Sequence, residues 1–127
     1  MLRLQSDFAA LIEAALARRL DQVEASWDSR PTLGVVMAAG GYPDSYRKGD
    51  AISGLDEADS ETVKVFHAGT RLNDGVITTN GGRVLCVTAL GDDLAQAQQA
   101  AYAAVAKIHW QGAFCRHDIG YRALQRD

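Results

Sequence analysis

The sequence has few of the residues that mark several classes of protein. Among its 127 residues there are only two cysteines, Cys86 and Cys115. Two are too few for a disulfide framework, and these lack the close pairing expected of a metal site. This usage favours a reducing compartment. No run of lysine and arginine marks a surface for nucleic acid or for an anionic membrane.

Long apolar segments are also missing. A helix that crosses a bilayer needs about 20 apolar residues, and the longest helical apolar run, residues 94–108, is interrupted by three glutamines and a lysine. The opening residues 1–7 contain no apolar core of a signal peptide. We therefore predict a cytoplasmic protein with no nucleic acid and no membrane among its partners.

What the sequence does have is the composition of an ordinary globular domain. Hydrophobic residues make up 47% and charged residues 23%, and the net charge of −3 comes from interleaved acids and bases. A chain of 127 residues suffices for one domain. It buries about two-thirds of its unfolded surface, so an independent core is expected.

The first segment has helical periodicity. Ser6 is the predicted N-cap, and Asp7 favours the N-terminus electrostatically. The apolar residues that recur at helical spacing are Phe8, Leu11, Ile12, Ala15, Leu16 and Leu20. Residues 21–30 are polar and lead to Pro31, so we predict a linker there, with Trp27 as the residue that anchors it.

Short strands follow. The run 33–39 is apolar and rich in valine, which favours a buried strand, and residues 40–50 have the glycine and proline of a loop. Residues 63–69 alternate like a strand with one buried face. Two glycine-bearing turns, 73–75 and 80–82, then lead into strands over 76–79 and 83–90.

The periodicity changes again after the last strand. Asp92 or Asp93 is the predicted cap of an amphipathic helix from Leu94 to Ile108, and a polar-aromatic tail over 114–127 closes with a short helix from Tyr121. The sequence therefore predicts an α+β fold. Its core is a small antiparallel β-barrel or sandwich with one packed amphipathic helix, and a second helix lies at the N-terminus.

Three stretches carry a specific resemblance. Residues 33–43, 65–70 and 79–88 resemble, in order and spacing, the C-terminal domain of the glycinamide ribonucleotide synthetase family. The opening 1–7 and the tail 108–120 are similar to that family as well. The resemblance implies an ATP-grasp C-terminal domain of the rudimentary hybrid-motif type over residues 31–127. It also implies that residues 1–30 are the terminal helix and linker of the ATP-grasp core.

The family joins glycine to phosphoribosylamine with ATP, and Mg²⁺ or Mn²⁺ bridges the nucleotide phosphates. The resemblance implies that the metal ligands and nucleotide-binding strands precede Met1, in N-terminal and ATP-grasp domains that this chain lacks. We therefore expect this fragment to carry no catalytic residue, no metal and no cofactor, and to be inactive alone. Its apolar N-terminal helix, without the ATP-grasp core, is predicted to mediate a homodimer.

Six residues are candidates for substrate binding. Arg83 offers forked donors for a phosphate or carboxylate, and Gly81 and Gly82 let a ligand approach the backbone. Tyr42 offers a hydroxyl, while Lys64 and Arg71 add positive charge near a phosphoribosyl group. The alternatives are a Gly-Gly turn followed by a solvated arginine, a tight exit from a buried strand, and solvated surface cations.

Other residues favour structural interpretations. The strand residue His67 is more typical of a structural histidine than of a base, and the basic neighbour Arg116 would lower the pKa of Cys115. The acidic run over 56–61 is predicted to be a solvated loop. Three functions remain open: a ligase subdomain that lines the active-site cleft, a non-catalytic stand-alone module for binding or scaffolding, and a carboxylase-type C-terminal domain.

Overall fold

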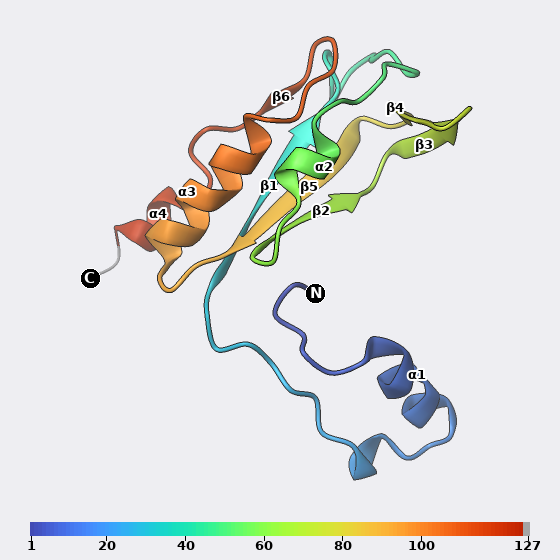
Figure 1. Ribbon diagram of the computed structural model, residues 1–127, viewed down its shortest axis with the longest axis vertical. Coiled ribbons are helices and arrows are strands. Elements are labelled where there is room, and N and C mark those ends of the chain that lie inside the picture. Colours follow the sequence, from blue (N-terminus) through green and yellow to red (C-terminus); the bar gives the residue numbers. More distant parts are fainter. Residues whose placement is uncertain (126–127) are drawn as a thin grey trace.

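The computed structural model describes residues 1–125. An antiparallel four-stranded sheet in the order β2-β5-β1-β6 forms its centre, and α3 packs along one face (Figure 1). A separate two-stranded hairpin, β3–β4, lies at one end, and an N-terminal arm, residues 1–31, extends from the other. The strands are β1 (Thr32–Ala38), β2 (Val63–His67), β3 (Thr70–Asn73), β4 (Val76–Thr79), β5 (Arg83–Leu90) and β6 (Phe114–Cys115). The helices are α1 (Phe8–Leu16), the 3-10 turn η1 (Leu20–Gln22), α2 (Leu55–Ala58), α3 (Leu94–Val105) and α4 (Tyr121–Leu124).

The core lies between the sheet and α3. Alternation along β1 and β5 places the fully buried Val35 opposite Val87 on the helix side. The helix contributes Ala97, Ala101 and Ala104, and their small side chains let it approach the strands closely. The predicted strands 33–39 and 83–90 and the predicted packed helix are therefore confirmed, although the helix ends at Val105 rather than Ile108.

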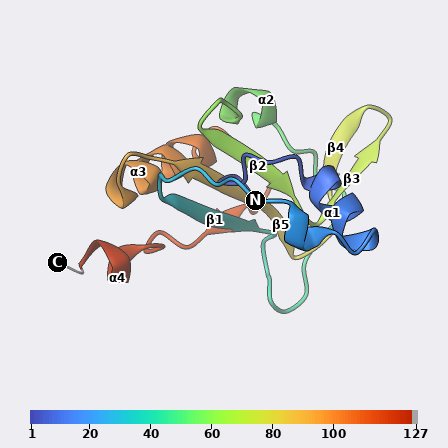
Figure 2. The ribbon, with the colours of Figure 1, turned by 90° about the horizontal axis from the view of Figure 1, so that it is seen from below.

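The opposite face of the sheet is only partly covered. It carries Val36, Phe66 and Cys86, which lie next to one another across β1, β5 and β2. The arm reaches over one side of this face, where Met1 to Arg3 and Trp27 line a hollow of about 360 Å³ with Phe66 and Cys86. The other side stays open, and Val36 is exposed there. We call this surface the outer face. Figure 2 shows the whole molecule turned by 90°, seen from below.

The two predicted glycine-bearing turns, 73–75 and 80–82, connect strands in different ways. Asp74 and Gly75 both adopt positive φ angles, which is the backbone of a tight hairpin turn, and β3 and β4 pair around them as predicted. The second turn, 80–82, instead leads β5 into the other sheet, where it pairs with β1 and β2 and not with β4. The prediction of an α+β fold with antiparallel sheets is confirmed, but the described strands form two separate sheets and no closed barrel.

Two short elements were not predicted from the sequence. The acidic run over 56–61, predicted as a loop, overlaps α2, and Phe114 and Cys115 form β6 beside Met37 and Ala38 of β1. The predicted short helix from Tyr121 is confirmed as α4, while the last two residues of the predicted tail, 126–127, lie outside the described residues. In the described part of the chain, no helix combines the length and the apolar character that crossing a membrane requires.

The N-terminal helix is shorter than predicted. Asp7, not Ser6, is its N-cap, since the Asp7 carboxylate accepts hydrogen bonds from the backbone N–H groups of Ala9 and Ala10 at 2.8 and 3.3 Å. Ser6 instead accepts a hydrogen bond from the Ser26 N–H. The helix ends at Leu16, before Arg18 adopts a left-handed conformation with φ of 56°.

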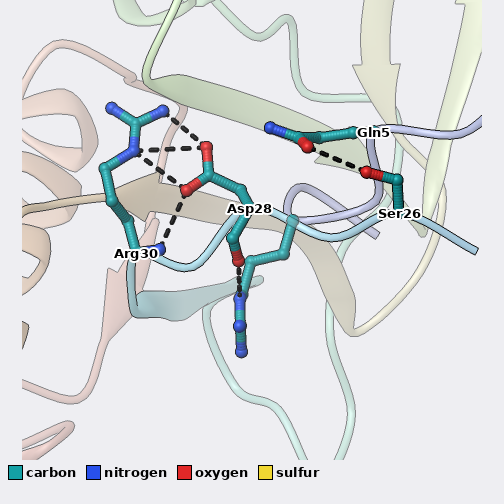
Figure 3. Close-up of polar contacts among 5 residues, drawn as sticks. Gln5, Ser26, Asp28 and Arg30 are labelled. Atoms are coloured by element: carbon teal, nitrogen blue, oxygen red, sulfur yellow. Dashed lines mark hydrogen bonds and ion pairs between the residues drawn. The ribbon is translucent and has the colours of Figure 1, made fainter.

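The end of the predicted linker is hydrogen-bonded to the start of the chain. The backbone of Gln5 donates to the Ser26 carbonyl, and Asp28 and Arg3 exchange hydrogen bonds through N–H, carbonyl and guanidinium groups at 2.7 and 2.8 Å. The Asp28 carboxylate also accepts hydrogen bonds from two guanidinium nitrogens and the backbone N–H of Arg30 (Figure 3). We call residues 3–6 with 26–30 the clasp. The clasp closes the arm into a loop.

The clasp should weaken in acid. Hydrogen bonds from Arg30 lower the pKa of Asp28 from 3.8 to about 2. A carboxyl whose folded pKa is depressed stabilises the fold fully above its unfolded pKa, and this contribution is lost as the pH falls from about 4 towards 2. We expect the Asp28 carboxyl carbon to titrate near pH 2 by NMR, and amide-exchange protection of Gln5 and Asp28 to fall over the same interval. An Asp28 midpoint near pH 4, or unchanged protection at pH 2, would contradict this account of the clasp.

Candidate functional site

A hollow of about 340 Å³ opens on the uncovered side of the outer face. Its lining is mainly apolar, and two arginines are among its lining residues. The residues come from four segments: Gly34, Val36 and Ala38 of β1, Tyr42 and Pro43 of the following loop, Arg83 of β5, and Phe114, Cys115, Arg116 and Ile119 at the C-terminal end. A mainly apolar lining with a few charged groups is the usual character of a small-molecule site. We call it the Arg83 cavity.

An irregularity in the sheet places Arg83 at the cavity. The β1–β5 register shifts after Met37, so that Ala38 lies opposite Arg83 and Val84 has no partner on β1. Val84 and Leu85 are consequently both fully buried, which breaks the alternation of faces. Arg83 therefore shares the outer face with Ala38. Among the described residues it forms no ion pair, which leaves its charge available to a ligand.

Tyr42 reaches the cavity by packing on a glycine. Its ring lies so close to Gly82 that a Cβ atom there would overlap it and would come within 3.0 Å of the Tyr46 ring. Tyr46 packs beside Tyr42, with ring centroids 6.2 Å apart. Further along this loop, hydrogen bonds join Gly49 and Asp50 to Thr79. Gly82 thus has a packing role: its missing side chain is the space that Tyr42 occupies.

Gly81 also packs against the protein itself. A Cβ atom on Gly81 would lie 2.9 Å from the Cα of Gly69, so the backbone of the turn before β5 touches that of the β2–β3 connection. These contacts explain both glycines structurally. A direct contact of Gly81 or Gly82 with a ligand stays a prediction.

The C-terminal wall depends on side chains from α3. The Tyr102 hydroxyl donates to the Arg116 carbonyl and accepts from the Ile119 N–H, at 2.7 and 3.1 Å. The Gln98 side chain donates to the Ile119 carbonyl at 2.7 Å. These bonds hold the segment after β6 against the helix, while Phe114 is positioned by the pairing of β6 with β1. Phe114 and Arg116 line the same hollow as Arg83.

The two arginines differ in their electrostatic state. Arg116 forms two hydrogen bonds to the Asp118 carboxylate, at 2.9 and 2.6 Å, and they lower the pKa of Asp118. The charge of Arg116 is therefore largely compensated, whereas that of Arg83 is not. An incoming anion would interact most strongly with Arg83, with Arg116 as a second donor once it is released from Asp118.

The remaining candidates lie elsewhere. Lys64 is ion-paired with Asp59, which also accepts a hydrogen bond from the Val65 N–H. Arg71 lies on the exposed β3 of the hairpin. Neither lines the Arg83 cavity, so the structure brings together Arg83, Tyr42 and the supporting Gly82 but not the two other cations.

Two further expectations concern reactive groups. Burial raises the pKa of the Cys115 thiol, so the expected lowering by its neighbour Arg116 is wrong. His67 shares a hydrogen bond of 3.1 Å with the Thr70 hydroxyl. Within residues 1–125, no group of three or more His, Cys, Asp and Glu side chains is arranged to hold a metal ion.

Comparison with known proteins matches this chain to one family. The family described as "Phosphoribosylglycinamide synthetase, C domain" matches residues 32–122. Proteins named phosphoribosylamine–glycine ligase from Pseudomonas putida and Allochromatium vinosum are 61% and 62% identical over all 127 residues. The chain spans only 30% of the length of these relatives.

A solved structure supports the same relationship. The crystal structure of a phosphoribosylamine–glycine ligase from Thermotoga maritima superposes with a TM-score of 0.65 and 33% sequence identity. The match covers 85% of this chain and 27% of that one. The described fold is therefore similar to one part of a longer protein.

The packing of Tyr42 on Gly82 gives a test of the cavity. We expect Gly82→Ala to destabilise the fold by about 1–3 kcal/mol, because the new methyl group overpacks against the Tyr42 ring. Urea denaturation would measure the loss. In a Tyr42→Ala background most of the cost should vanish, since the space is then empty. An equal cost of Gly82→Ala in both backgrounds would show that the ring does not occupy this space.

Proposed function

The chain belongs to the family of phosphoribosylglycinamide synthetase C domains, and we propose that it is the C-terminal domain of a phosphoribosylamine–glycine ligase. In this proposal the complete enzyme joins glycine to 5-phosphoribosylamine with hydrolysis of ATP, in the cytoplasm. The observation that carries it is the similarity of the entire chain to ligases at 55–62% identity. A stand-alone module would have no reason to keep this similarity over its full length.

The Arg83 cavity supports a more specific role. We propose that it forms one wall of the active-site cleft and binds the phosphoribosyl group, with the Arg83 guanidinium donating to the phosphate. In this proposal the Tyr42 hydroxyl donates a hydrogen bond to the same ligand, and Val36 and Phe114, which line the hollow as well, form its apolar border. Lys64 is held by Asp59 and Arg71 lies on the hairpin, so both are weaker candidates for this contact.

ATP and the metal ion belong elsewhere in the proposed enzyme. We assign Mg²⁺ or Mn²⁺, and the nucleotide whose phosphates it would neutralise, to the part of the relatives that this chain does not span. The contribution of the present residues is then to bind and orient the acceptor substrate. No catalytic residue is assigned to them.

The division of the chain follows from the same proposal. Residues 31–127 form the C-terminal domain, and residues 1–30 belong to the ATP-grasp core. Two observations support this boundary: the matched family region begins at residue 32, and the hydrophobic core contains no residue of the arm. The N-terminal and ATP-grasp domains are accordingly the partners that would cover the arm in the complete enzyme.

Free copies of the chain would lack that cover. Of the residues in α1 only Ala14 is buried, while Phe8, Ile12 and Leu16 are exposed. Burying a side chain of this kind stabilises a protein by roughly 1.5–3 kcal/mol, so their exposure favours association. We propose that free copies form a homodimer through α1.

A chimeric enzyme tests the ligase proposal. We expect a Pseudomonas putida ligase in which this chain replaces the matching stretch to form glycinamide ribonucleotide at a rate of the same order as its parent, because every residue of the chain has a counterpart there. The isolated chain should form none, because in this proposal ATP and the metal ion bind to the part of the enzyme that the chain does not span. Product formation by the pure chain would refute the fragment interpretation, and a folded but inactive chimera would favour a non-catalytic module.

The same chimera tests Arg83. We expect Arg83→Ala to raise the KM for phosphoribosylamine roughly 10- to 150-fold, since losing a charged hydrogen bond costs about 1.5–3 kcal/mol. The KM values for ATP and glycine should change little. Lys48→Ala, which removes an exposed cation outside the cavity, is the matched control. Unchanged kinetics in a folded Arg83→Ala enzyme would make Arg83 a solvated surface residue.

A further inference from the structure

We propose that the segment after β6, residues 116–119, is a second phosphate-binding element of the Arg83 cavity. Arg116 exchanges its bond with Asp118 for one with the ligand phosphate, and the Tyr102 hydroxyl holds the segment in the position that this exchange requires. We call residues 116–119 the tail loop. This inference rests on the phosphoribosyl-binding role proposed above and adds two residues to it: Arg116 contacts the ligand, and Tyr102 is a positioning residue that acts through Arg116.

Arg116 stands between two hollows. It lines the Arg83 cavity, and it also lines a neighbouring hollow of about 310 Å³, which Asp118 lines as well. In the part of the chain that the structure describes, no aspartate or glutamate lines the Arg83 cavity, although the chain has 16 acidic residues and a net charge of −3. The charged residues around the cavity are therefore arginines alone, and a lining of one sign attracts a ligand of the opposite sign.

The bond between Arg116 and Asp118 is easily replaced. Two guanidinium nitrogens of Arg116 donate to the carboxylate at 2.9 and 2.6 Å, but the two side chains are 72% and 49% exposed. Water and salt screen an ion pair this exposed, so little free energy opposes its opening. A phosphate offers the guanidinium more acceptor oxygens and more charge than a carboxylate does. The exchange therefore favours a phosphate ligand over a carboxylate one.

The helix α3 fixes the backbone of the tail loop, which runs back along it between β6 and α4 (Figure 1). The Tyr102 hydroxyl donates to the Arg116 carbonyl at 2.7 Å and accepts from the Ile119 N–H at 3.1 Å, so one hydroxyl joins both ends of the loop. The Tyr102 ring also stacks on the His117 ring, with centroids 6.2 Å apart. The backbone of Arg116 is thus held while its exposed side chain can turn between the two hollows.

Gly120 anchors the far end of the tail loop to the sheet. Its φ angle is 87°, and a Cβ atom there would lie only 2.5 Å from a methyl carbon of Leu33. The chain after the loop therefore lies directly on β1, the strand that also contributes Val36 and Ala38 to the cavity. Because the loop is attached to both α3 and β1, Arg116 is presented at a fixed place beside the cavity.

Variants of the chimeric ligase test the two roles. We expect Arg116→Ala to raise the KM for phosphoribosylamine roughly 5- to 50-fold, because a charged hydrogen bond is lost. Tyr102→Phe should raise it roughly 3- to 10-fold, because the ring and its stacking on His117 remain while the loop is released. The kcat and the KM values for ATP and glycine should change little. Lys48→Ala and Tyr121→Phe, outside the cavity, are the matched controls.

The double variant shows whether Tyr102 acts through Arg116. In an Arg116→Ala background, Tyr102→Phe should have no further effect on the KM for phosphoribosylamine, since the side chain that the loop positions is already absent. If Tyr102→Phe costs as much without Arg116 as with it, or lowers kcat for all substrates alike, Tyr102 has only a structural role and this part of the inference is wrong.

Binding to the isolated chain gives a readout that needs no ligase activity. We expect ribose 5-phosphate to shift the NMR signals of the Nε–H groups of Arg83 and Arg116, and ribose alone to shift neither. Asp118→Asn should lower the dissociation constant for ribose 5-phosphate roughly 2- to 5-fold, because a competing carboxylate is removed. Weaker binding by Asp118→Asn would show that Asp118 orients Arg116 instead of competing for it, and would overturn the exchange.

The outcomes distinguish this inference from the function on which it rests. If the Arg83 signal shifts and the Arg116 signal does not, or if Arg116→Ala leaves the KM for phosphoribosylamine unchanged while Arg83→Ala raises it, the tail loop is not a binding element and the proposed role of Arg83 stands. If ribose 5-phosphate shifts neither signal, the cavity is not a phosphate site, and the proposed phosphoribosyl-binding role fails with it.

Discussion

The packing of α3 against one face of the four-stranded sheet is the constraint on which the other features depend. Alanines on the helix pack against the buried Val35 and Val87 of the strands at this interface. Because α3 covers this face, the outer face is left for other contacts. The same helix, through Tyr102 and Gln98, also holds the segment that completes the candidate site. One face of the four-stranded sheet thus forms the hydrophobic core with α3, and the other face carries the candidate site.

The candidate site is built by close backbone packing rather than by flexible side chains. Because Gly82 has no side chain, the Tyr42 ring can lie against the backbone just before β5. A shift in register turns the neighbouring Arg83 to the outer face. Arg116 is restrained by Asp118, which leaves Arg83 as the lining arginine without an ion pair among the described residues. This arrangement is what supports our proposal that the hollow binds the phosphoribosyl group of the substrate.

The parts of this fold that could be predicted are those with local causes. The valine-rich run of β1 and the helical spacing of α3 depend on neighbouring residues, as does the turn at Asp74 and Gly75. The β6 strand could not be predicted, because its two residues pair with β1 and the segment after it is held by side chains of α3. Arg83 was identified from the two glycines that precede it, which is a local signal. Arg116 was not recognised as part of the site, because its position depends on contacts with residues distant in sequence. A closed barrel was inferred from several short strands joined by glycine-bearing turns, but such turns do not determine which strands pair, and β5 joins β1 and β2 instead.

The central claim is that this chain supplies the phosphoribosyl-binding wall of a ligase, with Arg83 as the principal contact. A crystal structure of the chimeric ligase with glycinamide ribonucleotide bound tests that claim most directly. The account predicts the ligand phosphate within hydrogen-bonding distance of the Arg83 guanidinium, at about 2.7–2.9 Å, and the Tyr42 ring still packed on Gly82. A ligand phosphate bound by other residues, with the Arg83 side chain in solvent, would contradict it.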